Sequence, residues 1–226
     1  MPSHHGKQKQ LAKRKKKRDL AQRKPRPAAL GPTQESLVRE AMMFPQGPAF
    51  LSAGWDSADE QAPQLVTAVV TRVAPIGGIL IPSVALVDRT CLGIKNGFLA
   101  APAKRADLDA WLDRVAAVHG GIEEVPLLYV QSVVYHAIDY ARSLGFEPHP
   151  DFPEPLFGPR PEHLRDTPLA HRARPFYMPG PEDDSAVVIQ RLIRAVGEGN
   201  FDFAAGGPTL IGDLGDDEDL DEEGDE

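Results

Sequence analysis

The chain is poor in cysteine, with Cys91 as the only one among 226 residues. An internal disulfide needs two cysteines, and a zinc knuckle needs several thiolates close together. The sequence therefore excludes a disulfide scaffold and a multi-cysteine zinc site. Such sparse cysteine usage fits a reducing compartment, so we expect the protein to be cytoplasmic.

Long hydrophobic runs are also missing. The longest one lies near residues 79–87 and is far shorter than the roughly 20 apolar residues that cross a bilayer. The basic start of the chain is not followed by the apolar stretch of roughly 7 to 15 residues that a secretory signal requires. We therefore expect neither a membrane partner nor export by that route.

Charge is abundant, and its two signs are separated along the chain. Residues 1–26 hold eleven Lys or Arg against a single acid, whereas residues 213–226 hold ten acids and no base. Segments with such dense charge of one sign repel themselves and bury little apolar surface. The predicted organisation is a disordered basic tail over residues 1–30, a helix and linker over 31–63, an α+β core domain over 64–205 and a disordered acidic tail over 206–226.

The central part of the chain predicts a β-hairpin and several helices. QLVTAVVTRV (64–73) and GILIPSVALVD (78–88) are rich in β-branched residues and flank a glycine turn, which indicates two antiparallel strands. Pro82 places the second strand at an edge or at a bulge, because proline cannot donate to the ladder. Apolar residues at three- and four-residue spacing predict helices within residues 32–43 and over 107–118, 127–144 and 184–196.

Two stretches are rich in residues that break regular structure. Residues 44–63 contain repeated Pro and Gly and are expected to form a loop or linker. Residues 147–181 hold ten of the 22 prolines together with several aromatic side chains, which indicates a long segment wrapped against the core. The predicted fold class is α+β: a single domain with an antiparallel β-hairpin packed against three to four helices and a long Pro-rich wrapping loop.

Four motifs stand out: VDRTCLGIKNGF (87–98), HAIDYARSLGFEPHPDF (136–152), PFYMPGPEDD (175–184) and GEGNFDF (197–203). Together they resemble a group of bacterial proteins that have a basic N-terminal tail and no assigned activity. In that group a strand ends in Val-Asp, Cys-Leu-Gly and a lysine follow, and a Leu-Gly-Phe, Pro-His, Asp-Phe string comes later. This chain has Asn96 where members often have an acid. The resemblance implies an architecture and a short list of positions, but no reaction.

Cys91 is the first candidate for catalysis. A nucleophilic cysteine must be partly thiolate, which a nearby cation and a histidine base favour. Lys95 could supply the charge, and His136 or His149 the base. However, no known protease or transferase signature surrounds Cys91, and free cysteine is among the most buried residue types. A structural cysteine at a strand-to-helix turn is therefore the favoured interpretation.

Carboxylates and imidazoles form a second candidate set. Asp88 ends a predicted strand, His136 and Asp139 lie three residues apart on one helix face, and His149 and Asp151 follow in the next loop. Such groups can bind a divalent metal, for which His149 and Asp151 are the candidate ligands, or act as acid and base in hydrolysis. The helix pair fits a solvated face equally well. No other cofactor is expected.

The basic tail is the third candidate, and it favours binding rather than catalysis. Lysine and arginine clusters neutralise phosphates and release counterions, which gives affinity without sequence preference. No aromatic residues are interleaved to stack bases. The tail therefore predicts electrostatic attraction to RNA, DNA or the ribosome, or else a solubilising arm. The candidate contact residues are Lys13, Arg14, Lys15, Lys16, Lys17 and Arg18.

Three functions follow from these features. The first is a nucleic-acid- or ribosome-associated binding module, in which the acidic tail could compete with nucleic acid by pairing with the basic tail at low salt. The second is a small hydrolase or nuclease that uses the Asp and His set, with or without Cys91. The third is a structural scaffold. The sequence alone does not decide whether the chain is an enzyme, and it leaves the oligomeric state open.

Overall fold

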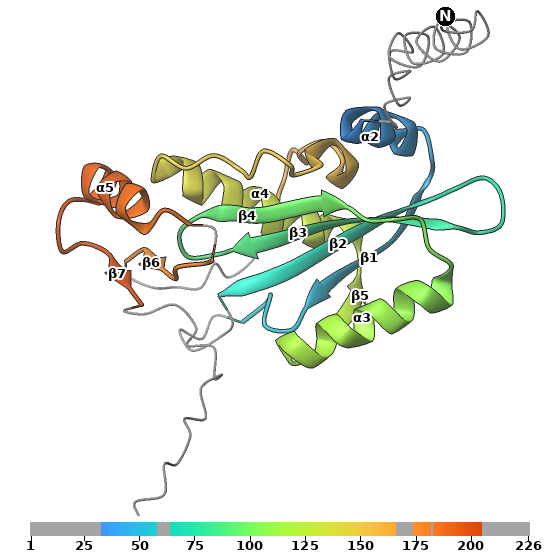
Figure 1. Ribbon diagram of the computed structural model, residues 1–226, viewed down its shortest axis with the longest axis horizontal. Helices are drawn as coiled ribbons and strands as arrows, with labels where there is room; N and C mark the ends of the chain where they lie inside the picture. The colour runs from blue at the N-terminus through green and yellow to red at the C-terminus, as the bar shows by residue number, and fades with distance from the viewer. Residues whose placement is uncertain (1–32, 58–63, 166–173, 182, 205–226) are drawn as a thin grey trace, which may run out of the picture. The chain divides into compact units, whose positions relative to one another are not determined.

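The computed structural model describes residues 33–57, 64–165, 174–181 and 183–204 (Figure 1). The chain divides into two units, residues 1–39 and 40–226. Helix α2, Gln34–Met42, begins in the first unit, where the Thr33 hydroxyl accepts a hydrogen bond from the backbone N–H of Ser36 at 3.2 Å. A polar side chain that caps the first turn in this way starts the helix expected within residues 32–43.

An antiparallel sheet of five strands forms the centre of the second unit. Its order is β4-β3-β2-β1-β5, and every neighbouring pair is antiparallel. The predicted hairpin is confirmed as β2 and β3, and the α+β class is confirmed with it. The strands are β1 (Gln46–Ser52), β2 (Leu65–Val73), β3 (Leu80–Asp88), β4 (Gly93–Leu99) and β5 (Ile122–Val125).

Strand β1 corrects the expectation that residues 44–63 form only a loop or linker. It lies between β2 and β5, so the sheet begins well before residue 64. Its Pro and Gly residues sit where the pairing with β2 shifts register, between Gln46 and Ala49. A side chain at Gly47 would place its Cβ 2.4 Å from the Thr71 hydroxyl oxygen. Glycine here therefore allows the close approach of two strands and does not break the sheet.

Strand β3 corrects the expectation about Pro82. The strand is internal, between β2 and β4, and Pro82 itself pairs with Thr71 of β2. On the other side, the pairing with β4 ends at Ser83 opposite Leu99, and the Pro82 carbonyl accepts a hydrogen bond from Ala100 at 2.8 Å. The missing N–H of Pro82 thus lies just beyond the last residue pair of β3 and β4. An internal strand tolerates proline at this position, because no hydrogen bond of that pair is lost.

Two helices cover the two faces of the sheet unequally. Helix α4, Leu127–Ser143, runs behind the strands in Figure 1 and packs against β1, β2, β3 and β4. Helix α3, Arg105–His119, lies on the opposite face beside β1 and β5. Its buried residues Leu108 and Leu112 pack against Phe50, Val69, Leu80 and Val84. The part of this face formed by β3 and β4 has no helix of its own among the described residues.

The C-terminal part of the described chain contacts the sheet in two places, with η1 beside β2 and with β6 at the β3–β4 turn. It contains the 3₁₀ helix η1 (Glu154–Phe157), helix α5 (Ser185–Val196) and the short parallel strands β6 (Phe176–Tyr177) and β7 (Asp202–Phe203). Leu156 and Phe157 are fully buried, and so are Tyr177 and Leu192. The predicted wrapping of the Pro-rich segment is thereby confirmed for its described residues. The predicted helix over 184–196 corresponds to α5.

Candidate functional site

Asp88 closes strand β3 and organises the turn that follows. Its carboxylate accepts hydrogen bonds from the backbone N–H groups of Thr90 at 2.9 Å, Cys91 at 3.1 Å and Leu92 at 3.2 Å, and from the Thr90 hydroxyl at 2.9 Å. Burial raises the pKa of the Asp88 carboxyl, while the hydrogen bonds from Thr90 and Leu92 act in the opposite direction. These donors occupy the oxygens that a substrate or a metal would need, so the side chain holds a turn.

Cys91 lies inside that turn and is fully buried. Burial raises the pKa of its thiol, and the Asp88 carboxylate adds to the effect, so the sulfur stays protonated. The turn joins β3 to β4, which corrects the expected strand-to-helix turn. Gly93 makes this connection possible because it adopts φ 69°, and because a Cβ there would meet the Cβ of Ala141 at 2.7 Å. Cys91 thus has the surroundings of a core residue, in which burial outweighs the charge of Lys95 and keeps the thiol protonated.

Lys95 forms a partly buried ion pair with Asp183. The Nζ atom lies 2.8 Å from the Asp183 carboxylate and donates to the Met178 carbonyl at 2.7 Å. The two side chains are 11% and 15% exposed. The Asp183 carboxylate also accepts a hydrogen bond from the Gly180 N–H at 2.7 Å. Lys95 therefore fastens Met178 and Asp183 to strand β4, and its charge lowers the pKa of the Cys91 thiol less than burial raises it.

The polar face of α4 holds part of the Pro-rich segment. His136 Nε2 lies 3.0 Å from the carbonyl oxygen of Arg165, whose backbone N–H donates to the Ser132 hydroxyl at 2.9 Å. Asp139 accepts two hydrogen bonds from the Arg160 guanidinium, which lower the pKa of the Asp139 carboxyl. The stripe that suggested acid and base chemistry thus binds residues 160–165 of the same chain.

His149 and Asp151 make local contacts near strand β4. The backbone N–H of His149 donates to the Ile94 carbonyl at 3.0 Å, and His149 Nδ1 accepts from the backbone N–H of Asp151 at 3.2 Å. Across the described residues, no group of three or more His, Cys, Asp or Glu side chains is arranged to bind a metal ion. The two proposed metal ligands, His149 and Asp151, therefore lie together in one turn and have no third such side chain beside them among the described residues. The six candidate residues of the basic tail, 13–18, lie outside the described residues.

The seven candidate catalytic and metal-binding residues make contacts in different parts of the fold. Asp88, Cys91 and Lys95 belong to the β3–β4 hairpin, while His136 and Asp139 contact residues 160–165. None of the seven lines either of the two pockets described next.

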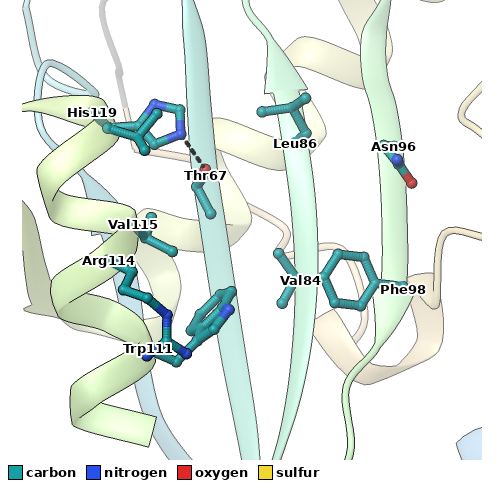
Figure 2. Close-up of a pocket in the computed structure, with 10 residues that line it drawn as sticks. Thr67, Val84, Leu86, Asn96, Phe98, Trp111, Arg114, Val115 and His119 are labelled. Carbon is teal, nitrogen blue, oxygen red and sulfur yellow. Dashed lines mark hydrogen bonds between the residues drawn. The ribbon is translucent and has the colours of Figure 1, made fainter. Parts of the chain in front are cut away.

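A groove lies between α3 and the uncovered part of the sheet (Figure 2). Thr67, Val84 and Leu86 of β2 and β3 form its floor, α3 forms one wall and β4 the other. Its volume is about 330 Å³, at the lower end of the range for ligand pockets. Phe98 is 44% exposed and Val118 is 79% exposed, which is unusual for large apolar side chains that share one hollow. The wall residues are Trp111, Arg114, Val115, Val118 and His119 on α3, and Asn96 and Phe98 on β4.

The polar groups of the groove are few and lie mainly on the α3 wall. His119 Nε2 lies 3.2 Å from the Thr67 hydroxyl oxygen. The exposed Arg114 donates to the Ala110 carbonyl of its own helix at 3.1 Å, and no ion pair is recorded for it within the described part of the chain. The groove is thus an apolar surface with a cationic guanidinium beside it. Such a surface suits an apolar ligand that carries a negative charge.

A second pocket, of about 350 Å³, lies where α4 ends near α5. Arg142, Arg191 and Arg194 line it. Arg142 pairs with Glu147 at 3.0 Å, and the Arg191 guanidinium lies over the Phe146 ring at 5.8 Å from its centroid. All three guanidinium groups are on exposed side chains, so they remain accessible to an anion.

Sequence reasoning identified neither pocket. The groove combines residues from four elements, and its apolar wall residues look like ordinary core positions of α3 and β4 in the sequence. Two features of the sequence indicate the groove. Val118 extends the apolar spacing of α3 to its last turn, and Phe98 lies two residues after Asn96 on β4, which is an edge strand. No helix in the described ranges is long and apolar enough to cross a membrane. Comparison of the chain with protein-family models, with curated protein sequences and with solved structures gives no match.

Proposed function

We propose that the protein is a non-enzymatic binding module that associates with nucleic acid or with the ribosome through its basic N-terminal residues. The observation that carries this proposal is the charge of residues 1–26, which is +10 within a chain whose total charge is −8. A cationic segment of this density attracts a polyanion by releasing its counterions, and it needs no shaped groove.

The surroundings of the candidate catalytic residues support binding over hydrolysis. The Asp88 carboxylate holds a turn, the Cys91 thiol is buried and protonated, and Lys95 is paired with Asp183. A general acid or base has to reach the substrate, and a nucleophile has to be ionised or next to a base. The pocket of Arg142, Arg191 and Arg194 would give the folded part of the chain a fixed phosphate contact.

Fluorescence anisotropy with a labelled single-stranded RNA and the matching DNA, over a series of NaCl concentrations, tests the proposal. The intact chain is compared with the variant K13S/R14S/K15S/K16S/K17S/R18S. If all six side chains contact phosphates, the slope of log K against log [salt] becomes shallower by about four, because each contact contributes roughly 0.7 on a single strand. A control that exchanges Lys for Arg and Arg for Lys at the same six positions keeps the charge and should bind as the intact chain does.

An affinity and a slope that both stay unchanged in the six-site serine variant would refute the proposal. Hydrolysis of the labelled strand during the titration would instead support the hydrolase or nuclease alternative. Absence of any binding at low salt would leave the scaffold alternative.

The same assay tests whether the acidic residues 213–226 compete with nucleic acid. They carry as much charge as the basic residues and compete with nucleic acid for them if the two segments pair. Deleting residues 213–226 should tighten RNA and DNA binding, most at low ionic strength, since exposed charges are screened beyond roughly 10 Å at moderate salt. An affinity that does not change across the salt series would exclude this competition.

A further inference from the structure

The groove beside α3 is an apolar surface that the described part of the chain leaves open. Its β3–β4 side has no helix over it, and Phe98 and Val118 expose much of their side chains to solvent. Exposed apolar surface of this kind usually marks a place where another segment or molecule binds. The guanidinium of Arg114 at the α3 wall indicates that the occupant carries acidic groups next to apolar ones.

The described chain ends near the side chain of Lys95 in strand β4. The backbone N–H of Ala204 donates to the Tyr177 carbonyl at 3.0 Å, and the carbonyl of the next residue, Met178, accepts from Lys95 Nζ at 2.7 Å. Lys95 immediately precedes Asn96, which lines the β4 wall. These contacts connect Ala204, the last described residue, to strand β4, whose Asn96 and Phe98 form one wall of the groove.

Residues 205–226 have the composition that the groove requires. Their large apolar residues are Leu210, Ile211, Leu214 and Leu220, and the first three form the compact sequence LIGDL, residues 210–214. Asp213 and Asp216 accompany them, and further acids follow. The six residues from 205 to 210 span about 20 Å when extended, at roughly 3.4 Å each. Leu210 can therefore lie up to about 20 Å from the last described residue.

We propose that the C-terminal segment of residues 210–216 docks in the groove between α3 and the β3–β4 face, with its aliphatic side chains on the apolar floor and its aspartates facing Arg114 and His119. Covalent attachment gives this segment an effective concentration in the millimolar range, so a weak intrinsic affinity is enough to keep the groove occupied. The docking does not depend on nucleic-acid binding, and it leaves the acids beyond residue 216 outside the groove.

Trp111 lies on the α3 wall and reports on occupancy. The chain has only one other tryptophan, Trp55, so Trp55→Phe leaves Trp111 as the single fluorophore. In this background the full chain is compared with the triple variant L210D/I211D/L214D. The triple variant should raise the acrylamide quenching constant of Trp111 by about twofold and shift its emission to the red, because the tethered segment no longer fills the groove.

Leu220→Asp is the matched control, because it makes the same chemical change in the same segment outside residues 210–216. It should leave the emission of Trp111 as it is in the intact chain. A synthetic peptide of residues 205–216, added to the triple variant, should restore the original quenching. Equal quenching in the intact chain and the triple variant would overturn the proposal.

A groove variant tests the other side of the contact. Val118 is 79% exposed, so Val118→Glu should fold normally and should reproduce the quenching of the triple variant. Ile76→Glu, at a residue 83% exposed in the β2–β3 turn, is its control. Quenching that changes with protein concentration and not with the tail substitutions would assign the groove to a second copy of the chain and reject the tail as its occupant.

Discussion

The two faces of the sheet differ in how completely they are covered. On the α4 face, the helix packs against four strands, and Phe152 and Phe157 of the Pro-rich segment fill the remaining space of the same cluster. On the opposite face, α3 lies beside β1 and β5, and the groove remains over β3 and β4. The same strands supply both faces, because successive side chains of a strand alternate between them.

This difference separates residues that maintain the fold from residues available for binding. The α4 cluster is buried, and even the polar stripe of α4 is used to hold residues 160–165. The α3 face has a smaller cluster and an open apolar margin. A search for function that follows acidic and histidine side chains leads to α4, whereas the apolar groove lies on the α3 face.

The largest expected effect is on the α4 face. Ile138 is 1% exposed in the α4 cluster, and Ile138→Ala should lower the free energy of unfolding by about 2 to 5 kcal/mol, since it removes buried methyl groups and leaves a cavity. Urea unfolding followed by far-UV circular dichroism measures the loss. A change below about 1 kcal/mol would mean that this face is not the tightly packed one.

The β3–β4 turn, where the hairpin ends, should give the next effect. Asp88→Ala leaves the buried N–H groups of Thr90, Cys91 and Leu92 without their acceptor and should cost about 2 to 4 kcal/mol. Asp88→Asn keeps one carbonyl acceptor and should cost less. Urea unfolding of the three proteins at a single pH ranks them, and an equal loss for both variants would contradict this role.

The pH dependence of the Asp88 effect has a defined sign. Burial raises the pKa of the folded carboxyl above its ordinary value of about 3.9, so the protonated form is favoured in the folded state. Protonation of Asp88 therefore stabilises the folded state. This stabilisation is fully present when the pH is below the ordinary pKa of an aspartate, and it is lost as the pH rises through the raised pKa of Asp88. The advantage of the native chain over Asp88→Asn should therefore shrink as the pH increases from about 4. An advantage that grows with pH would show that the hydrogen bonds to the carboxylate outweigh its burial.

The smallest effect is expected in the groove. Phe98 is 44% exposed, so Phe98→Ala should change the free energy of unfolding by less than about 1 kcal/mol. Urea unfolding beside Ile138→Ala gives the comparison directly. If the two substitutions cost the same, the groove is part of the core, and the contrast between the two faces does not hold.

Much of the fold is predictable from local patterns. The apolar spacing of α3, α4 and α5 matches the predicted ranges, and Gly120 in the left-handed conformation ends α3. Strands β1, β4 and β5 were not predicted. β1 and β4 contain Gly or Pro where another backbone or a ring approaches closely, as at Gly97, where a Cβ would lie 2.9 Å from the Cα of Phe152. Such glycines signal tight tertiary contact, which no local pattern distinguishes from a loop.

The candidate sites were less predictable than the fold. The close spacing of His136 and Asp139 did identify one polar face of α4, but the partners of these side chains, Arg160 and Arg165, are more than 20 residues away. The groove exists because α3 covers only part of the sheet. Which part a helix covers depends on how the whole domain packs, so local sequence patterns do not predict it. The resemblance to bacterial proteins with a basic tail stays a prediction.

Strands β6 and β7 determine how a pulling force on the C-terminal segment would reach the rest of the fold. The pair is only two residues long on each strand. Strand β6 is held by two hydrogen bonds between Phe176 and Thr90 and by the burial of Tyr177, whereas both residues of β7 are exposed. Tension applied by a partner that holds the acidic residues would reach this short ladder before it reached the sheet. The exposed strand β7 would separate from the buried β6 first, while the five-stranded sheet stayed intact.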